Sequence, residues 1–271
     1  NLGALFGQLA CGWLGEEVGW RWGFSAAAVG MFLGLVQFKL TRRHVAHLGT
    51  RVEHEGQNLR REWMCFWVGL VVVVVLTVLC VSGVLQIDAL KLAKQTAWVI
   101  GGVALLYFTW AFAFAGLPAV ELKRLVVIVV HFAASALFWA GFEQVGSSFS
   151  IFAERFTIRK FGSFEVPASW IQALNPLCVI GLAPVVAGLW SWLARRNTSP
   201  SLTMKVSWSL LMLAVGFAVA AWAAHRALNL GPVWPTWLMT VVVVHTLGEL
   251  FISPVGLSAV TKLSPPRLTG Q

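Results

Sequence analysis

The chain has 271 residues, of which 58% are hydrophobic and only 11% charged, and its mean hydropathy is +0.77. Ordinary soluble domains carry about 25% charged residues, so this composition excludes a soluble globular domain and predicts a polytopic membrane protein. The net charge of +9 does not indicate a nucleic-acid partner, because the basic residues gather in short segments between apolar runs, as membrane topology requires.

Apolar runs of about 20 residues, the length that a spanning helix needs, predict seven full spans and two partial ones. All are expected to be helices, because unpaired backbone cannot face lipid. The partial spans are 1–13 and a segment opening at 265, and the full spans are 22–39, 65–85, 96–117, 125–153, 168–194, 206–224 and 236–261. The expected fold class is therefore an all-α transmembrane bundle.

The orientation follows from the basic residues. When the loops are numbered alternately, thirteen of the twenty Lys and Arg residues fall in one set and seven in the other. The richer set is expected to be cytoplasmic. It includes the polar linker 40–64, which is therefore predicted to lie inside the cell.

Two carboxylates, Glu143 and Glu249, lie deep in predicted spans. A charge at the bilayer centre costs at least about 2.5–3.5 kcal/mol, so both residues are predicted to be functional rather than incidental. The alternative is a purely structural role, in which each Glu is protonated and forms hydrogen bonds with a neighbouring helix.

Helical spacing extends each carboxylate into a polar stripe, because residues four apart share a helix face. One stripe consists of His131, Ser135, Trp139, Glu143 and Ser147, and the other of His245, Glu249, Ser253 and Gly256. Such stripes face a bundle interior or a water-filled cavity. Trp139 and His245 are therefore candidate cavity-lining residues, whereas most other tryptophans lie near span ends, as in an aromatic belt.

Proline and asparagine mark a third feature. Pro176 follows Asn175 in the span 168–194, and Pro254 follows Ser253. A proline inside a helix frees a carbonyl, and transporters use such breaks to line binding sites; a simple packing kink is the alternative. Asn1 lies at a depth comparable with that of the two carboxylates, so these residues are expected to share one central cavity.

The sequence contains no arrangement typical of an enzyme or of a metal site, and its four cysteines lie in apolar segments without metal-ligand spacing. We therefore expect no cofactor, with the proton as a coupling ion. A transporter needs only a midplane binding site, a proton-sensitive carboxylate and two halves that move. The remote rival is a membrane-embedded enzyme that uses Glu143 and His131 as acid and base.

Several long motifs resemble the proton-dependent oligopeptide transporters of the major facilitator superfamily. The segment NLGALFGQLACGWLGEEVGWRWGFSAAAVGMFLGL is similar to their fifth and sixth helices. FWAGFEQVGSSFSIFAERFT resembles the seventh helix, VPASWIQALNPLCVIGLAPV the eighth and TLGELFISPVGLSAVTKLSP the tenth. The resemblance implies proton-coupled import of di- and tripeptides by alternating access across a bacterial inner membrane.

The resemblance also implies roles for single residues. Glu143 matches a glutamate implicated in proton coupling, and Glu249 one that receives the peptide amino terminus. Ser253 matches a serine of the same site, and Asn175 and Asn1 match asparagines that bind the peptide backbone. The closest rival function is that of a family relative that carries nitrate or another small anionic or conjugated metabolite.

The resemblance implies a division of the chain as well. Residues 1–39 correspond to the last two helices of the amino-terminal bundle, 40–64 to the linker, 65–117 to an accessory helical hairpin and 118–271 to the carboxy-terminal bundle. Counterparts of the family's helices 1–4 and most of 11–12 are absent from this sequence, and they include the cation expected to bind the peptide carboxylate.

Overall fold

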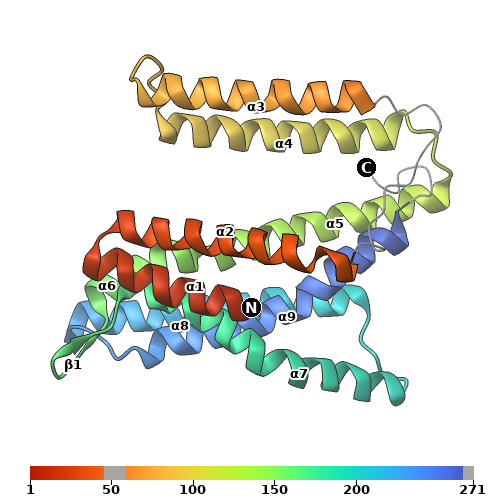
Figure 1. Ribbon diagram of the computed structural model, residues 1–271. Helices are drawn as coiled ribbons and strands as arrows, with labels where there is room; N and C mark the ends of the chain where they lie inside the picture. The colour runs from red at the N-terminus through yellow and green to blue at the C-terminus, as the bar shows by residue number, and fades with distance from the viewer. Residues whose placement is uncertain (46–58, 265–271) are drawn as a thin grey trace. The chain divides into compact units, whose positions relative to one another are not determined.

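The computed structural model of the chain describes residues 1–45 and 59–264. Most of these residues are helical (Figure 1), and the strands among them form one hairpin of two residues each. The elements, in chain order, are α1 (Leu2–Trp13), η1 (Leu14–Val18), α2 (Trp20–Val45), α3 (Leu59–Val81), α4 (Ala89–Ala113), α5 (Ala119–Phe142), η2 (Glu143–Gly146), α6 (Ser148–Phe156), β1 (Lys160–Phe161), β2 (Phe164–Glu165), η3 (Ala168–Ala173), α7 (Leu174–Arg195), α8 (Leu202–Leu230) and α9 (Thr236–Leu263).

Seven of the described helices are long and apolar enough to cross a membrane. Each overlaps one of the seven predicted full spans, and α1 corresponds to the partial span 1–13. The ends of the predicted linker 40–64 are helical instead, since α2 continues to Val45 and α3 begins at Leu59. Arginine ends an apolar run without ending a helix, because it is a good helix former. The rest of the linker lies outside the described residues.

The chain forms two compact units, one of residues Asn1–Leu35 and Pro118–Gln271 and the other of Val36–Leu117. In the second unit, the side chains of α3 and α4 are almost all exposed, which suits helices that face lipid. Asp88 caps α4 by accepting hydrogen bonds from the amides of Leu90 and Lys91 at 3.0 and 3.1 Å. The accessory role of this unit stays a prediction.

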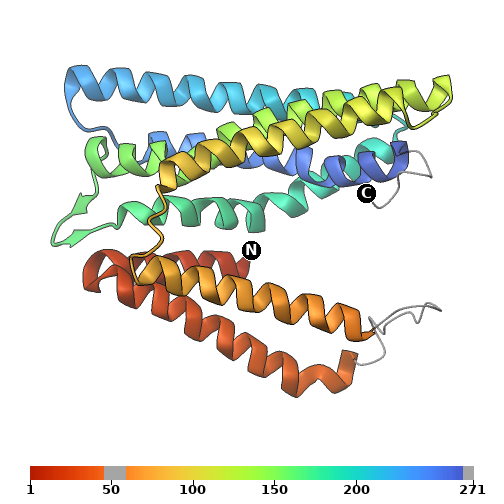
Figure 2. The ribbon, with the colours of Figure 1, turned by 90° about the horizontal axis from the view of Figure 1, so that it is seen from above.

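The core of the first unit lies where α9 packs against α8, α7 and α5 (Figures 1 and 2). Small residues let these helices approach closely, as is common between membrane helices. A Cβ atom at Gly216 of α8 would overlap the ring of His245, and one at Gly248 of α9 would lie 2.9 Å from Phe138. Both glycines are therefore required by packing rather than by backbone conformation.

Two predicted continuous spans are interrupted, and the prediction of single regular helices was wrong at both places. The span 125–153 changes to a 3-10 turn at Glu143, and a new helix begins at Ser148 after Ser147 leaves the helical region with φ −127° and ψ −88°. The span 168–194 begins as the 3-10 segment η3, and α7 begins only at Leu174. Pro176 therefore lies in the first turn of α7, where a missing amide donor costs little, and it is not a break inside the helix.

Candidate functional site

Three polar side chains meet between α7 and α9. Asn175 lies in the first turn of α7, and its Nδ2 donates to Glu249 Oε2 at 2.7 Å and to Thr246 Oγ1 at 3.1 Å. Thr246 lies one turn before Glu249 on α9 and is fully buried, whereas Asn175 and Glu249 are half-buried. The structure thus brings together two predicted substrate-binding residues, whose roles stay predictions, and adds a threonine that the sequence analysis missed.

Glu143 is placed near this cluster by the end of α5. It is the first residue of η2 and its side chain is exposed. Its charge acts on Glu249, so the two carboxylates repel each other when both are ionised. Trp139 lies one turn earlier, with 37% of its surface exposed, and packs edge-on against Phe142 with 5.3 Å between the ring centroids.

The two histidines lie in helix packing. His245 is only 1% exposed, and its Nε2 donates to the carbonyl of Leu213 at 3.2 Å while its ring lies against Gly216. It therefore contacts α8, although it shares a helix with Glu249, which contacts α7. His131 is also buried and donates from Nδ1 to the carbonyl of Val127 in its own helix at 2.8 Å.

Asn1 and Ser253 lie apart from the Asn175–Glu249 pair. Asn1 borders a hollow of about 760 Å³ between the start of α1 and α7. The α7 residues that line this hollow are Val179, Ile180, Ala183, Pro184 and Ala187. Ser253 is exposed one turn after Glu249. The structure therefore places Asn1 beside the same helix as Asn175 but does not bring the two side chains together.

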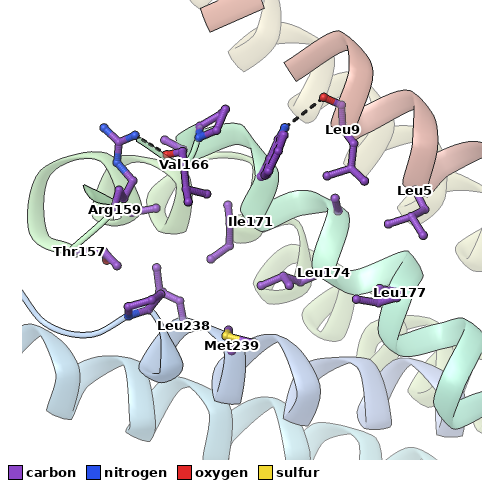
Figure 3. A pocket seen from close by; sticks show the side chains of 16 residues that line it. Leu5, Leu9, Thr157, Arg159, Val166, Ile171, Leu174, Leu177, Leu238 and Met239 are labelled. Atoms are coloured by element: carbon purple, nitrogen blue, oxygen red, sulfur yellow. Dashed lines mark hydrogen bonds between the residues drawn. The ribbon is translucent and has the colours of Figure 1, made fainter. Parts of the chain in front are cut away.

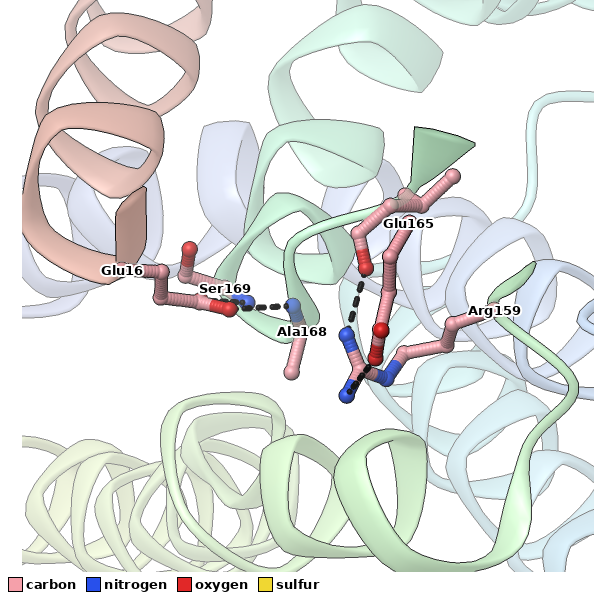
Figure 4. Close-up of polar contacts among 6 residues, drawn as sticks. Glu16, Arg159, Glu165, Ala168 and Ser169 are labelled. Atoms are coloured by element: carbon pink, nitrogen blue, oxygen red, sulfur yellow. Dashed lines mark hydrogen bonds and ion pairs between the residues drawn. The ribbon is translucent and has the colours of Figure 1, made fainter. Parts of the chain in front are cut away.

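A second polar contact joins the amino-terminal helices to the carboxy-terminal ones. The carboxylate of Glu16 in η1 accepts hydrogen bonds from the backbone amides of Ala168 and Ser169 at 2.9 and 2.8 Å (Figure 4). We call this pair of bonds the η1–η3 contact. Close by, Trp170 donates from Nε1 to the carbonyl of Leu9 at 3.0 Å. No local pattern predicts this contact, because its partners lie about 150 residues apart.

The surroundings of Glu16 favour its charged form. Burial raises the pKa of this carboxyl, but the donors of Ser169 and Ala168 and the positive charge of Arg159 outweigh it, so the pKa lies below its ordinary value of 4.5. Arg159 is itself fixed by an ion pair with Glu165 at 2.9 Å and a hydrogen bond to the carbonyl of Val166 at 2.6 Å. The β1–β2 hairpin therefore holds the positively charged guanidinium group of Arg159 beside the η1–η3 contact.

An apolar pocket of about 250 Å³ lies next to this contact (Figure 3). Leu5 and Leu9 of α1 face it from one side, with Ile171 of η3 and Leu238 and Met239 near the start of α9 around it. The pocket offers apolar surface and few polar partners. It is thus bounded by η3, one partner of the η1–η3 contact, and by α1, the helix that directly precedes η1.

The Asn175–Thr246–Glu249 cluster offers one carboxylate and hydrogen-bonding groups on two neighbouring helices. The carboxylate of Glu249 lies beside the amide of Asn175, and the oxygen acceptors of these two groups suit an ammonium group, which offers three donors. Among the described residues, no group of three or more His, Cys, Asp or Glu side chains is placed to hold a metal ion.

Known proteins resemble this chain both in sequence and in the arrangement of their helices. The POT family profile (PTR2) matches residues 1–271. A peptide transporter of Yersinia enterocolitica, YePEPT, is 36% identical over 280 residues that cover all of this chain and 55% of the relative. The chain therefore spans about half the length of this relative.

Solved structures agree with the sequence comparison. A crystal structure of a peptide transporter POT in complex with sulfate has a TM-score of 0.82 and 33% identity, and the match covers 100% of this chain and 55% of that one. A mutant peptide transporter POT in complex with alafosfalin has a TM-score of 0.81 and 31% identity, covering 100% and 54%. The expected fold, part of a major facilitator superfamily bundle, is confirmed. The chain belongs to the POT family of membrane transporters.

Proposed function

We propose that the intact protein imports di- and tripeptides together with protons by alternating access. The observation that carries this proposal is the hydrogen-bonded pair between α7 and α9, in which Asn175 donates to Glu249 at 2.7 Å. A half-buried carboxylate inside a membrane span is costly to retain without a function. The names of the relatives, which are peptide transporters, support the substrate class and speak against an enzyme.

The peptide amino terminus is the group that Glu249 would bind. Its second oxygen and Asn175 Oδ1 are acceptors on neighbouring helices, and an ammonium group placed between them forms charge-assisted hydrogen bonds, which are stronger than neutral ones. Ser253, one turn further along α9, is proposed as a supporting partner. Asn1, beside the hollow next to α7, is proposed to bind the peptide backbone further along the substrate.

Proton coupling is assigned to Glu143. Its exposed position at the end of α5 lets it exchange protons with water, and its repulsion of Glu249 links the charge of one carboxylate to that of the other. Protonation of Glu143 would therefore favour an ionised Glu249, which is the form that binds an ammonium group. Substrate and proton would then bind together, as symport requires.

Alternating access needs contacts that close one end of the cavity at a time. The η1–η3 contact ties the helices of the amino-terminal half to η3 at one end of the spans. At the level of Asn1, in contrast, a hollow separates α1 from α7. With the linker 40–64 in the cytoplasm, as we propose from its basic residues, the closed end is the outer one and the open end faces the cytoplasm of a bacterial inner membrane.

The test is uptake by the full-length protein in proteoliposomes. A pH gradient that is acidic outside should drive accumulation of a labelled dipeptide above its outside concentration, and collapse of the gradient should abolish it. Nitrate accumulation without peptide accumulation would favour the anion-carrying rival. Chemical conversion of peptide by protein in detergent would favour the enzymatic rival, and either result would overturn the proposal.

A further inference from the structure

Thr246 occupies a position that the proposed function leaves unexplained. Its side chain is fully buried between α9 and α7. Its hydroxyl donates to the carbonyl of Val242 at 2.7 Å. Because a threonine hydroxyl has a single proton, Thr246 can only accept from any further partner.

That further partner is the amide of Asn175. The two hydrogens of Nδ2 are directed to Thr246 Oγ1 at 3.1 Å and to Glu249 Oε2 at 2.7 Å. The oxygen and nitrogen of an amide have nearly the same size, so hydrogen bonds rather than packing decide which way the group faces. A rotation by half a turn would place Oδ1 against the lone pairs of Thr246. In the described part of the chain, no hydrogen bond occupies Oδ1.

Glu249 alone would not fix this orientation. An ionised carboxylate requires the NH₂ side of Asn175, but a protonated one also carries a donor and can face Oδ1 equally well. Thr246 does not titrate, so its acceptor faces Asn175 in either state. The constraint from Thr246 therefore persists when the charge of Glu249 changes.

We propose that Thr246 is a positioning residue, which holds the NH₂ group of Asn175 on Glu249 and leaves Oδ1 as an acceptor for an N–H donor of the substrate. The inference rests on the proposed function, because it assumes that Asn175 contacts a peptide. The simpler interpretation is a threonine that bonds only to the preceding turn of its own helix. The hydrogen bond to Asn175 distinguishes the positioning role from this simpler interpretation. A positioning residue affects peptide binding only through Asn175, whereas a threonine bonded only to its own helix does not depend on Asn175.

The test is a double-mutant cycle in the full-length protein, with dipeptide affinity as the measurement. Thr246→Val removes the hydroxyl and keeps the branched shape, whereas Thr246→Ser keeps the hydroxyl. Thr246→Val should weaken dipeptide binding about 3- to 10-fold, the range for one hydrogen bond. Thr246→Ser should stay within about two-fold of the wild type. In an Asn175→Ala background, Thr246→Val should cause no further loss.

The outcomes separate the two proposals. Equal losses from Thr246→Val with and without Asn175 would show a purely structural role and overturn the inference, as would a Thr246→Ser loss as large as that of Thr246→Val. Thermal unfolding identifies a misfolded Thr246→Val protein, and Thr246→Ala then takes its place in the cycle. A wild-type protein that binds no dipeptide would overturn the proposed function, and the positioning role with it.

Discussion

Replacing Glu16 with Gln should loosen the η1–η3 contact and expose the apolar pocket beside it. The amides of Ala168 and Ser169 each donate to a different oxygen of the Glu16 carboxylate. Glutamine keeps one of these acceptor oxygens but loses the other, together with the negative charge. Side-chain acceptors at helix starts contribute about 0.5–2 kcal/mol. Because Glu16 is exposed and solvent screens its charge, we expect the lower part of that range, about 0.5–1 kcal/mol. This corresponds to a shift of about two- to five-fold toward the open form.

Thiol labelling of the full-length protein measures that shift. A cysteine replaces Leu5, which lines the pocket, in a protein whose four native cysteines have been replaced. The rate of reaction with an impermeant maleimide added outside should rise about two- to five-fold in Glu16→Gln. Glu17→Gln is the matched control, because this exposed neighbour loses the same charge, and it should leave the rate unchanged. Equal rates in Glu16→Gln and the parent would refute the assignment of the contact as a closure.

The same contact has a defined pH dependence. The pKa of Glu16 is lowered when the contact is formed, so its stabilising effect is fully present above the ordinary carboxyl value of 4.5 and is lost as the pH falls through the lowered pKa. Because the thiolate fraction falls with pH in every variant, the labelling rate of the Leu5 cysteine is divided by that of the same cysteine in Glu16→Gln. This ratio should be flat from neutral pH down to about 4.5 and rise only below it. A rise already near neutral pH would point to a different titrating group.

The remaining predictions concern coupling, packing and orientation. Glu143→Gln should stop proton-driven accumulation of peptide but preserve counterflow, which needs no net proton movement; accumulation at the wild-type level would contradict the coupling role. Gly216→Ala should lower stability by about 1–3 kcal/mol through overpacking, as measured by thermal unfolding in detergent. Gly188→Ala, where a Cβ would meet nothing within 4 Å, should not. In intact cells, Ser163→Cys should react with an impermeant thiol reagent while Ser199→Cys stays protected, and the reverse pattern would invert the topology.

The membrane explains why the spans could be predicted. Hydrocarbon imposes a length and an apolar composition on each helix, and these constraints are local, so α8 and α9 could be located from hydropathy alone. It also makes a carboxylate within a long apolar run conspicuous, which is why Glu143 and Glu249 could be predicted as site residues. Their packing partners were not equally visible: nothing in the sequence distinguishes Thr246 from the other threonines of apolar runs.

The breaks in the helices could not be predicted from periodicity. The 3-10 start of α7 depends on a distant segment, since the amides of Ala168 and Ser169 donate to Glu16. At the turn that begins at Glu143, side chains of the same segment bond to the backbone instead, Gln144 to the carbonyl of Ala140 and Ser150 to that of Val145. The polar stripe from His131 to Ser147 therefore does not continue as one helix face. The η1–η3 contact is equally non-local, because the carboxylate of Glu16 finds its donors at the start of η3 only after the two segments have packed.

The central claim is that Glu249 binds the amino terminus of a peptide, and a comparison of two ligands tests it most directly. Leaving one partner of a buried charged pair alone costs on the order of 2–5 kcal/mol, so Glu249→Ala in the full-length protein should weaken binding of a free dipeptide by about 30-fold or more. The matching N-acetylated dipeptide has no ammonium group, and its affinity should fall much less. Equal losses for the two ligands would contradict the claim that Glu249 recognises the amino terminus.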